Sequence, residues 1–173
     1  MLHLSVTLDL ATDATSAGHM LADPRYVEQK VVASGAIEHQ VDVTGTADEA
    51  FTVATRRALP SDQIPAQVRG FVGNRIDVRL VEAWEAPQPD GGRAGTVVVE
   101  IAGAPVRLTG RCSLQPVGPA ASRLVYDGDL QAQIPLFGSA VEEAAARAIR
   151  GALGVEQQVA ERWIADHGRA EQP

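Results

Sequence analysis

The stretch IPLFGSAVEEAAARAI, residues 134–149, separates a run of strand patterns from one long helical pattern. Ile134 ends an alternating apolar segment, and the four residues from Ser139 to Glu142 match a capping box. The periodicity that follows predicts a helix over 139–166, about 42 Å long at 1.5 Å per residue. This helix decides the fold, because no other predicted helix is long enough to cover a sheet.

One face of this predicted helix carries small side chains where larger ones would fill more space. The stripe at helical spacing consists of Val141, Ala145, Ala148, Ala152, Val155, Val159 and Trp163. The alanines either let the helix pack very closely on its neighbour or form the roof of a space that stays open. The sequence leaves both interpretations standing.

Upstream of this stretch, the first pattern is a half-buried strand over 2–10, where apolar and polar residues alternate. Two short helices follow. Thr12 or Asp13 can cap the first, and the second begins at Asp23-Pro24 and ends at Gly35.

Six further strands are predicted between residues 37 and 134. They lie near 37–43, 51–57, 75–84, 96–102, 105–115 and 122–134. A slip of the apolar phase to Val81 predicts a bulge in the strand over 75–84. Gly110 is expected opposite Gly128 on the inner face of the last two strands, where paired glycines permit a sharp bend. A gap reserved for a ligand is the alternative reading of that pair.

This order of elements predicts an α+β fold. An antiparallel sheet of about seven strands has one face to bury, and it curves around the C-terminal helix. The two short helices follow the first strand. We expect a single domain over residues 1–167 and a polar tail over 168–173.

Composition narrows the classes of function. The chain has 173 residues and a net charge of −7, which disfavours binding to nucleic acid or to an anionic membrane. No apolar run approaches the roughly 18 residues that cross a bilayer, so we expect no integral membrane association. The first ten residues alternate in polarity, unlike a signal peptide, which indicates a cytoplasmic protein. Cys112 is the sole cysteine, so no internal disulfide is expected.

Polar residues on otherwise apolar strand faces are the candidates for a binding site. His39, Arg57, Glu82 and Tyr126 each continue the apolar face of a predicted strand. A mostly apolar pocket with a few such groups is the usual composition of a small-molecule site. The alternatives are satisfied core or rim residues for His39 and Tyr126, and solvated strand-end charges for Arg57 and Glu82. Trp84 is either a pocket wall or a core anchor.

Motifs for catalysis, metal binding and phosphate binding are absent from the sequence. We therefore expect no catalytic residue, metal or cofactor. Lys30, the one lysine beside fourteen arginines, is interpreted as a compositional bias without mechanistic meaning.

Five segments resemble a known superfamily. They are ADPRYVEQK (22–30), LPSDQIP (59–65), VEAWEA (81–86), APVRLTG (104–110) and IPLFGSAVEEA (134–144). With the order of elements, they resemble the helix-grip fold of the START, polyketide-cyclase and birch-pollen-allergen superfamily. Within it, they resemble an uncharacterised group of bacterial proteins. The resemblance implies a deep cavity between sheet and helix. It does not settle function, because the superfamily includes carriers, receptors and enzymes.

The leading hypothesis is that the chain, as a monomer or homodimer, binds a small hydrophobic molecule such as a lipid, polyketide or isoprenoid. The expected ligand-binding residues are His39, Arg57, Trp84, Tyr126, Val141, Ala145, Ala148 and Ala152. One alternative is a cyclase- or hydratase-like enzyme with His39 or Tyr126 as general acid or base. The other is a protein-interaction module whose core is filled.

Overall fold

The computed structural model describes residues 1–60, 62 and 66–170. Most of the 59–65 segment and the end of the expected tail, 171–173, lie outside the described residues. The strands are β1 Leu2–Leu10, β2 Glu38–Gly45, β3 Phe51–Pro60, β4 Arg75–Trp84, β5 Arg93–Ile101, β6 Val106–Gly118 and β7 Ala121–Ala132. The helices are α1 Ala14–Ala22, α2 Pro24–Ala33, α3 Ala66–Val72 and α4 Gly138–Ala170.

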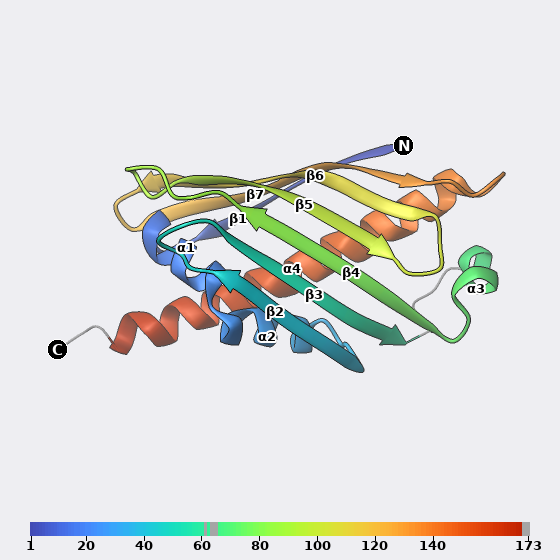
Figure 1. Ribbon diagram of the computed structural model, residues 1–173, viewed down its shortest axis with the longest axis horizontal. Coiled ribbons are helices and arrows are strands. Elements are labelled where there is room, and N and C mark those ends of the chain that lie inside the picture. Colours follow the sequence, from blue (N-terminus) through green and yellow to red (C-terminus); the bar gives the residue numbers. More distant parts are fainter. Residues whose placement is uncertain (61, 63–65, 171–173) are drawn as a thin grey trace.

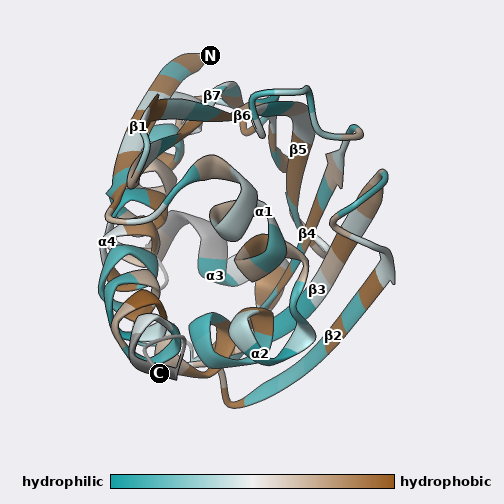
Figure 2. Cartoon of the chain, turned by 90° about the vertical axis from the view of Figure 1, so that its left-hand side faces the viewer, coloured by the Kyte–Doolittle hydropathy of each residue, from teal (hydrophilic) through white to brown (hydrophobic). Residues whose placement is uncertain are grey.

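The strands form one antiparallel sheet in the order β1-β7-β6-β5-β4-β3-β2. Seen end-on, the sheet curls into an open arc and α4 runs along its open side (Figure 2). Along the direction of the strands, α1 and α2 lie toward one end of the sheet and α3 lies at the opposite end (Figure 1). This arrangement confirms the predicted α+β helix-grip fold.

The two short helices begin where their capping signals predict. Asp13 accepts a hydrogen bond from the backbone N–H of Ser16, and Asp23 accepts one from the N–H of Arg25. Pro24 occupies the first position of α2, where its missing N–H costs nothing.

The expected pair of glycines is present in the sheet. Gly110 of β6 is directly opposite Gly128 of β7. A Cβ on Gly128 would lie 2.7 Å from the carbonyl oxygen of Thr109, and a Cβ on Gly110 would collide with the backbone of Asp127. The two strands can approach this closely only because neither position carries a side chain.

Two local expectations are wrong. The register of β4 against β3 is continuous from Arg75 to Trp84, so there is no bulge. The apolar phase slips only because Glu82 occupies an inner, buried position and Val81 an outer one. The capping box does not form, since α4 begins at Gly138 and the Glu142 carboxylate accepts the backbone N–H of Ala132 at 3.0 Å.

The buried face of α4 also differs from the predicted alanine stripe. Val141, Val159 and Trp163 are buried and Ala145 is partly buried, as expected. Ala148 and Ala152, however, are exposed, and their expected place on the buried face is corrected. The buried face also includes Ala146, Glu156 and Ala160. The predicted stripe includes apolar residues alone. Because the buried face contains the charged residue Glu156, the prediction is rotated about the helix axis relative to the observed buried face.

The inner face of the sheet is most completely covered near α1 and α2. In β3, β4 and β5, the buried inner residues lie at this end and include Phe51, Val53, Trp84 and Val97. Trp163 of α4 packs against Tyr26 of α2 edge to face, with ring centroids 5.7 Å apart. These contacts tie α4 and α2 together over one end of the sheet.

Candidate functional site

An apolar surface inside the arc is only partly covered. The helix α4 packs along β1, β7 and α2, and the described residues show no comparable packing of its backbone against β3, β4 or β5. Partly exposed apolar residues therefore occupy the inner face toward α3: Ile76, Val78, Leu80, Val99 and Ile101. Ala145, Ile149 and Leu153 of α4 are partly exposed as well. Solvent therefore reaches valine, leucine and isoleucine side chains on this part of the inner face.

A cluster of charged residues is buried beside this apolar surface. The Nζ atom of Lys30, from α2, lies 3.1 Å from Oε1 of Glu156 on α4 and 4.0 Å from Oε1 of Glu82 on β4. Only 7% of Lys30, 7% of Glu156 and 2% of Glu82 is exposed. Charged groups this deeply buried need partners, and here one ammonium lies between two carboxylates.

Aromatic side chains complete this cluster by donating hydrogen bonds to the carboxylates. Glu82 accepts one from the Tyr126 hydroxyl at 3.0 Å and one from Nε1 of Trp84 at 3.1 Å. The Tyr26 hydroxyl lies 3.4 Å from Oε1 of Glu156, at the long end of hydrogen-bond range. We call Tyr26, Lys30, Glu82, Trp84, Tyr126 and Glu156 the buried polar cluster.

Burial and neighbouring charges together set the protonation states of Lys30, Tyr26 and Tyr126. Burial by itself disfavours the Lys30 cation, but the carboxylates of Glu156 and Glu82 outweigh it, so the pKa of Lys30 lies above its ordinary value. Burial, reinforced by the same carboxylates, raises the pKa values of Tyr26 and Tyr126 well above 10. Both tyrosines are therefore neutral donors at physiological pH, and Lys30 is a cation.

Arg57 lies on the inner face of β3, between the buried polar cluster and the α3 end of the sheet. Its register neighbours are His39 on β2 and Val78 on β4. Burial lowers the pKa of the Arg57 guanidinium, and the carboxylates of Glu156 and Glu82 offset part of that effect. Arginine stays charged in proteins even so. Arg57 is thus a second cation inside the arc.

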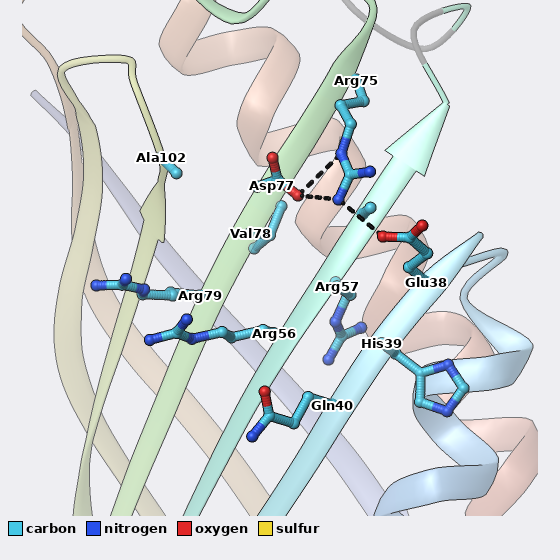
Figure 3. A pocket seen from close by; sticks show the side chains of 11 residues that line it. Glu38, His39, Gln40, Arg56, Arg57, Arg75, Asp77, Val78, Arg79 and Ala102 are labelled. Atoms are coloured by element: carbon cyan, nitrogen blue, oxygen red, sulfur yellow. Dashed lines mark hydrogen bonds and ion pairs between the residues drawn. The ribbon is translucent and has the colours of Figure 1, made fainter.

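The predicted site residues fall into three groups. Tyr126 and Trp84 converge on Glu82, and Arg57 lies on the same face of the sheet. Val141 is buried and Ala145 partly buried, but both lie toward the start of α4, 15 and 11 residues before Glu156. Ala148 and Ala152 lie outside, as stated above. His39 is exposed, points toward α2 and contacts Glu28 there (Figure 3). The structure therefore separates His39 from the buried polar cluster.

Sequence reasoning undervalued Glu82 and overlooked Lys30 and Glu156. A strand-end charge at Glu82 was the alternative interpretation, but its side chain is buried. Lys30 lies on the same helical face as the buried Tyr26 and Val27, and this placement of the chain's sole lysine was a usable signal. Glu156 lies three, four and seven residues before the buried Val159, Ala160 and Trp163, which was the corresponding signal in α4.

A groove of about 420 Å³ lies mainly on the outer face of β2, β3 and β4, and its lining also includes His39, Arg57 and Val78. Arg75 pairs there with Glu38 and Asp77 (Figure 3), which lie on either side of the buried Ala58 in the strand register. Arg56 and Arg79 are directly opposite each other on neighbouring strands and extend in the same direction. This groove is more polar than the inner face and is not part of the buried polar cluster.

The part of the chain that the structure describes contains neither a candidate metal site nor a candidate membrane-spanning helix. No group of three or more His, Cys, Asp or Glu side chains is arranged there to hold a metal ion. Likewise, none of the described helices combines the length and apolar character needed to cross a bilayer.

Solved structures with the same architecture come from distant organisms. The protein TTHA0849 from Thermus thermophilus matches with a TM-score of 0.60 at 13% identity, over 92% of this chain and 97% of that one. Human STARD10 matches with a TM-score of 0.60 at 13% identity, over 99% and 69%. The Zhui aromatase/cyclase from Streptomyces sp. R1128 matches with a TM-score of 0.56 at 12% identity, over 92% and 90%. At these identities the likeness establishes the fold alone.

The chain therefore has the helix-grip fold that these solved structures share. It belongs to the family described as "Protein of unknown function (DUF2505)", whose pattern matches residues 5–164. No curated protein matches the sequence.

Proposed function

We propose that this protein binds a small, largely hydrophobic molecule between α4 and the middle of the sheet. The observation that carries the proposal is the partly exposed apolar lining of β4, β5 and α4, closed at one end by the buried polar cluster. Burying apolar ligand surface contributes about 25 cal/mol per Å² before the costs of binding are subtracted. Lipids, polyketides and isoprenoids are the chemical classes that suit such a lining.

The named similar structures support this proposal without deciding the ligand. One is an aromatase/cyclase, and another is human STARD10. We further propose that the protein acts in the cytoplasm as a monomer or homodimer, with Arg57, Trp84, Tyr126, Val141 and Ala145 near the ligand.

The first test is native mass spectrometry of the protein purified gently from its own host, followed by organic extraction. A reproducible hydrophobic molecule bound to the protein supports the proposal. Repeated recovery of bare protein, with no uptake from a panel of lipids and polyketides, contradicts it and favours an interaction module with a filled core.

A matched pair of variants locates the ligand. Ala145→Trp adds a large side chain on the partly buried side of α4, where it would occupy the proposed space. Ala148→Trp makes the same change on the exposed side of the same helix. We expect ligand recovery to fall with Ala145→Trp and to stay at the wild-type level with Ala148→Trp. Equal recovery from both variants would place the ligand elsewhere.

A cyclase- or hydratase-like enzyme is the second candidate. It is favoured by one contact, the hydrogen bond from the Tyr126 hydroxyl to the buried carboxylate of Glu82. A phenol held beside a carboxylate could transfer a proton to or from a ligand in the same space. Incubation with the extracted molecule separates the candidates: a binding protein returns it unchanged, whereas an enzyme converts it and Tyr126→Phe slows that conversion.

A further inference from the structure

The Arg57 guanidinium has more hydrogen-bond donors than the protein uses. A guanidinium has five N–H donors and no acceptor. The one hydrogen bond from Arg57 that the structure records is from Nη2 to Oγ1 of Thr55, at 3.4 Å. Its Nε is shielded from solvent and has no acceptor. Among the residues that the structure describes, no carboxylate lies within 4.0 Å of this guanidinium.

The carboxylates nearest in the interior are engaged by other donors. Both oxygens of Glu82 are taken, one by Tyr126 and the other by Trp84. Glu156 receives its donors from Lys30 and Tyr26. Arg57 feels both carboxylates at longer range, but it has no direct ion-pair partner within the cluster. Leaving a half-buried cation without a close acceptor is unfavourable unless another molecule supplies one.

The surroundings of Arg57 define what that other molecule would be. Val78 is directly opposite it on β4, and Ile76 follows on the same face toward α3. Ile149 and Leu153 of α4 are the partly exposed apolar residues on the helix side of the interior. A ligand in this space would lie mainly against apolar side chains, with one strong cation on the sheet side.

We propose that Arg57 binds the anionic end, a carboxylate or phosphate group, of an amphipathic ligand whose apolar part lies between α4 and the middle of the sheet. The planar fork of a guanidinium suits both groups, because it can donate two parallel hydrogen bonds to their oxygens. This inference rests on the proposed function and narrows its ligand class from hydrophobic molecules in general to amphipathic anions.

The test compares three ligands that share one apolar chain: decanoate, decyl phosphate and 1-decanol. Each is titrated calorimetrically into the wild-type protein in a slightly alkaline buffer, in which the carboxyl group is ionised. We expect one or both anions to bind at least about tenfold more tightly than the neutral alcohol. The ratio of decanoate to decyl phosphate distinguishes a carboxylate ligand from a phosphate ligand.

Two variants on one strand assign the preference to Arg57. Arg57→Gln should abolish the preference for the anions while 1-decanol still binds. Arg56→Gln removes the neighbouring charge from the outer face of β3 and should leave the preference intact. Thermal unfolding checks that both variants fold. If Arg57→Gln does not fold, Arg57→Lys keeps the charge without the fork and should reduce the preference.

The possible failures have separate meanings. Equal binding of the anions and the alcohol by the wild-type protein overturns the role of Arg57 but leaves the proposed function intact. The same holds if Arg57→Gln keeps the full preference. No binding of any of the three, together with bare protein from the host, overturns the proposed function itself.

Discussion

Lys30 of α2 and Glu156 of α4 form an ion pair inside the protein, with Nζ and Oε1 3.1 Å apart. The two residues are 126 positions apart in the chain. Each helix would bury an uncompensated charge if the other helix did not supply the opposite charge. The pair joins the two helices over the covered end of the sheet, beside the apolar space. It therefore sets the polar boundary of the proposed binding site.

Breaking this pair should destabilise the fold strongly. Lys30→Met leaves the carboxylates of Glu156 and Glu82 buried without their cation, and we expect the free energy of unfolding to fall by about 3–5 kcal/mol. Lys30→Met combined with Glu156→Gln removes both charges of the ion pair and should recover part of that loss, because Glu82 keeps its donors Tyr126 and Trp84. Urea denaturation measures all three proteins.

The exposed ion pair between Arg75 and Asp77 is the control for this experiment. Arg75→Met should cost no more than about 1 kcal/mol, because exposed ion pairs contribute little. If Lys30→Met costs no more than Arg75→Met, the buried pair does not hold the structure together as described.

The tyrosines should resist ionisation while the protein is folded. Burial raises the pKa values of Tyr26 and Tyr126 well above 10, so the unfolded chain releases these protons first. Their contribution to stability is full below pH 10 and is lost as the pH rises through the folded-state pKa values. Lys30, whose pKa is also raised, acts in the same direction.

Ultraviolet titration tests this expectation. Tyrosinate absorbance should appear near pH 10 in urea, but in native buffer it should appear only when the protein unfolds. The stability of Tyr126→Phe should decline less steeply above pH 10 than that of the wild type. Ordinary titration of both tyrosines in the native protein would contradict their burial.

The paired glycines of β6 and β7 should not tolerate a side chain. A Cβ on Gly128 would lie 2.7 Å from the Thr109 carbonyl oxygen, so Gly128→Ala should lower the free energy of unfolding by about 1–3 kcal/mol or more. Gly151 of α4 is the control, because it is exposed and a Cβ there meets open space. Gly151→Ala should stabilise the protein by about 0.5–1 kcal/mol. Equal effects of the two substitutions in chemical denaturation would argue against this close approach of β6 and β7.

Glu142 should make the protein sensitive to acid. The backbone N–H of Ala132 donates to its carboxylate and holds the pKa of Glu142 below its ordinary value. The stabilisation is therefore present above about pH 4.5 and is lost as the pH falls through the lower, folded-state pKa. Glu142→Gln should flatten this decline in acid denaturation curves. Glu143→Gln, at the exposed next position, should leave the decline unchanged.

The sequence by itself determined the order of the elements and the class of the fold. Alternation of apolar residues located the strands, Asp13 and Asp23-Pro24 placed the two short helices, and the opposition of Gly110 and Gly128 followed from strand parity. These features are local or depend on the pairing of adjacent strands, so short-range patterns are enough to predict them.

The tertiary structure alone decided which charges are buried and which alanines face outward. Lys30, Glu82 and Glu156 come from three separate elements, and each reads as a surface residue until the other two are placed beside it. Burying one charged side chain is unfavourable unless oppositely charged groups pair with it, and no single segment of this chain contains those groups. For the same reason Ala148 and Ala152 could not be assigned, because the direction in which α4 faces the sheet is set by the contacts of the whole fold.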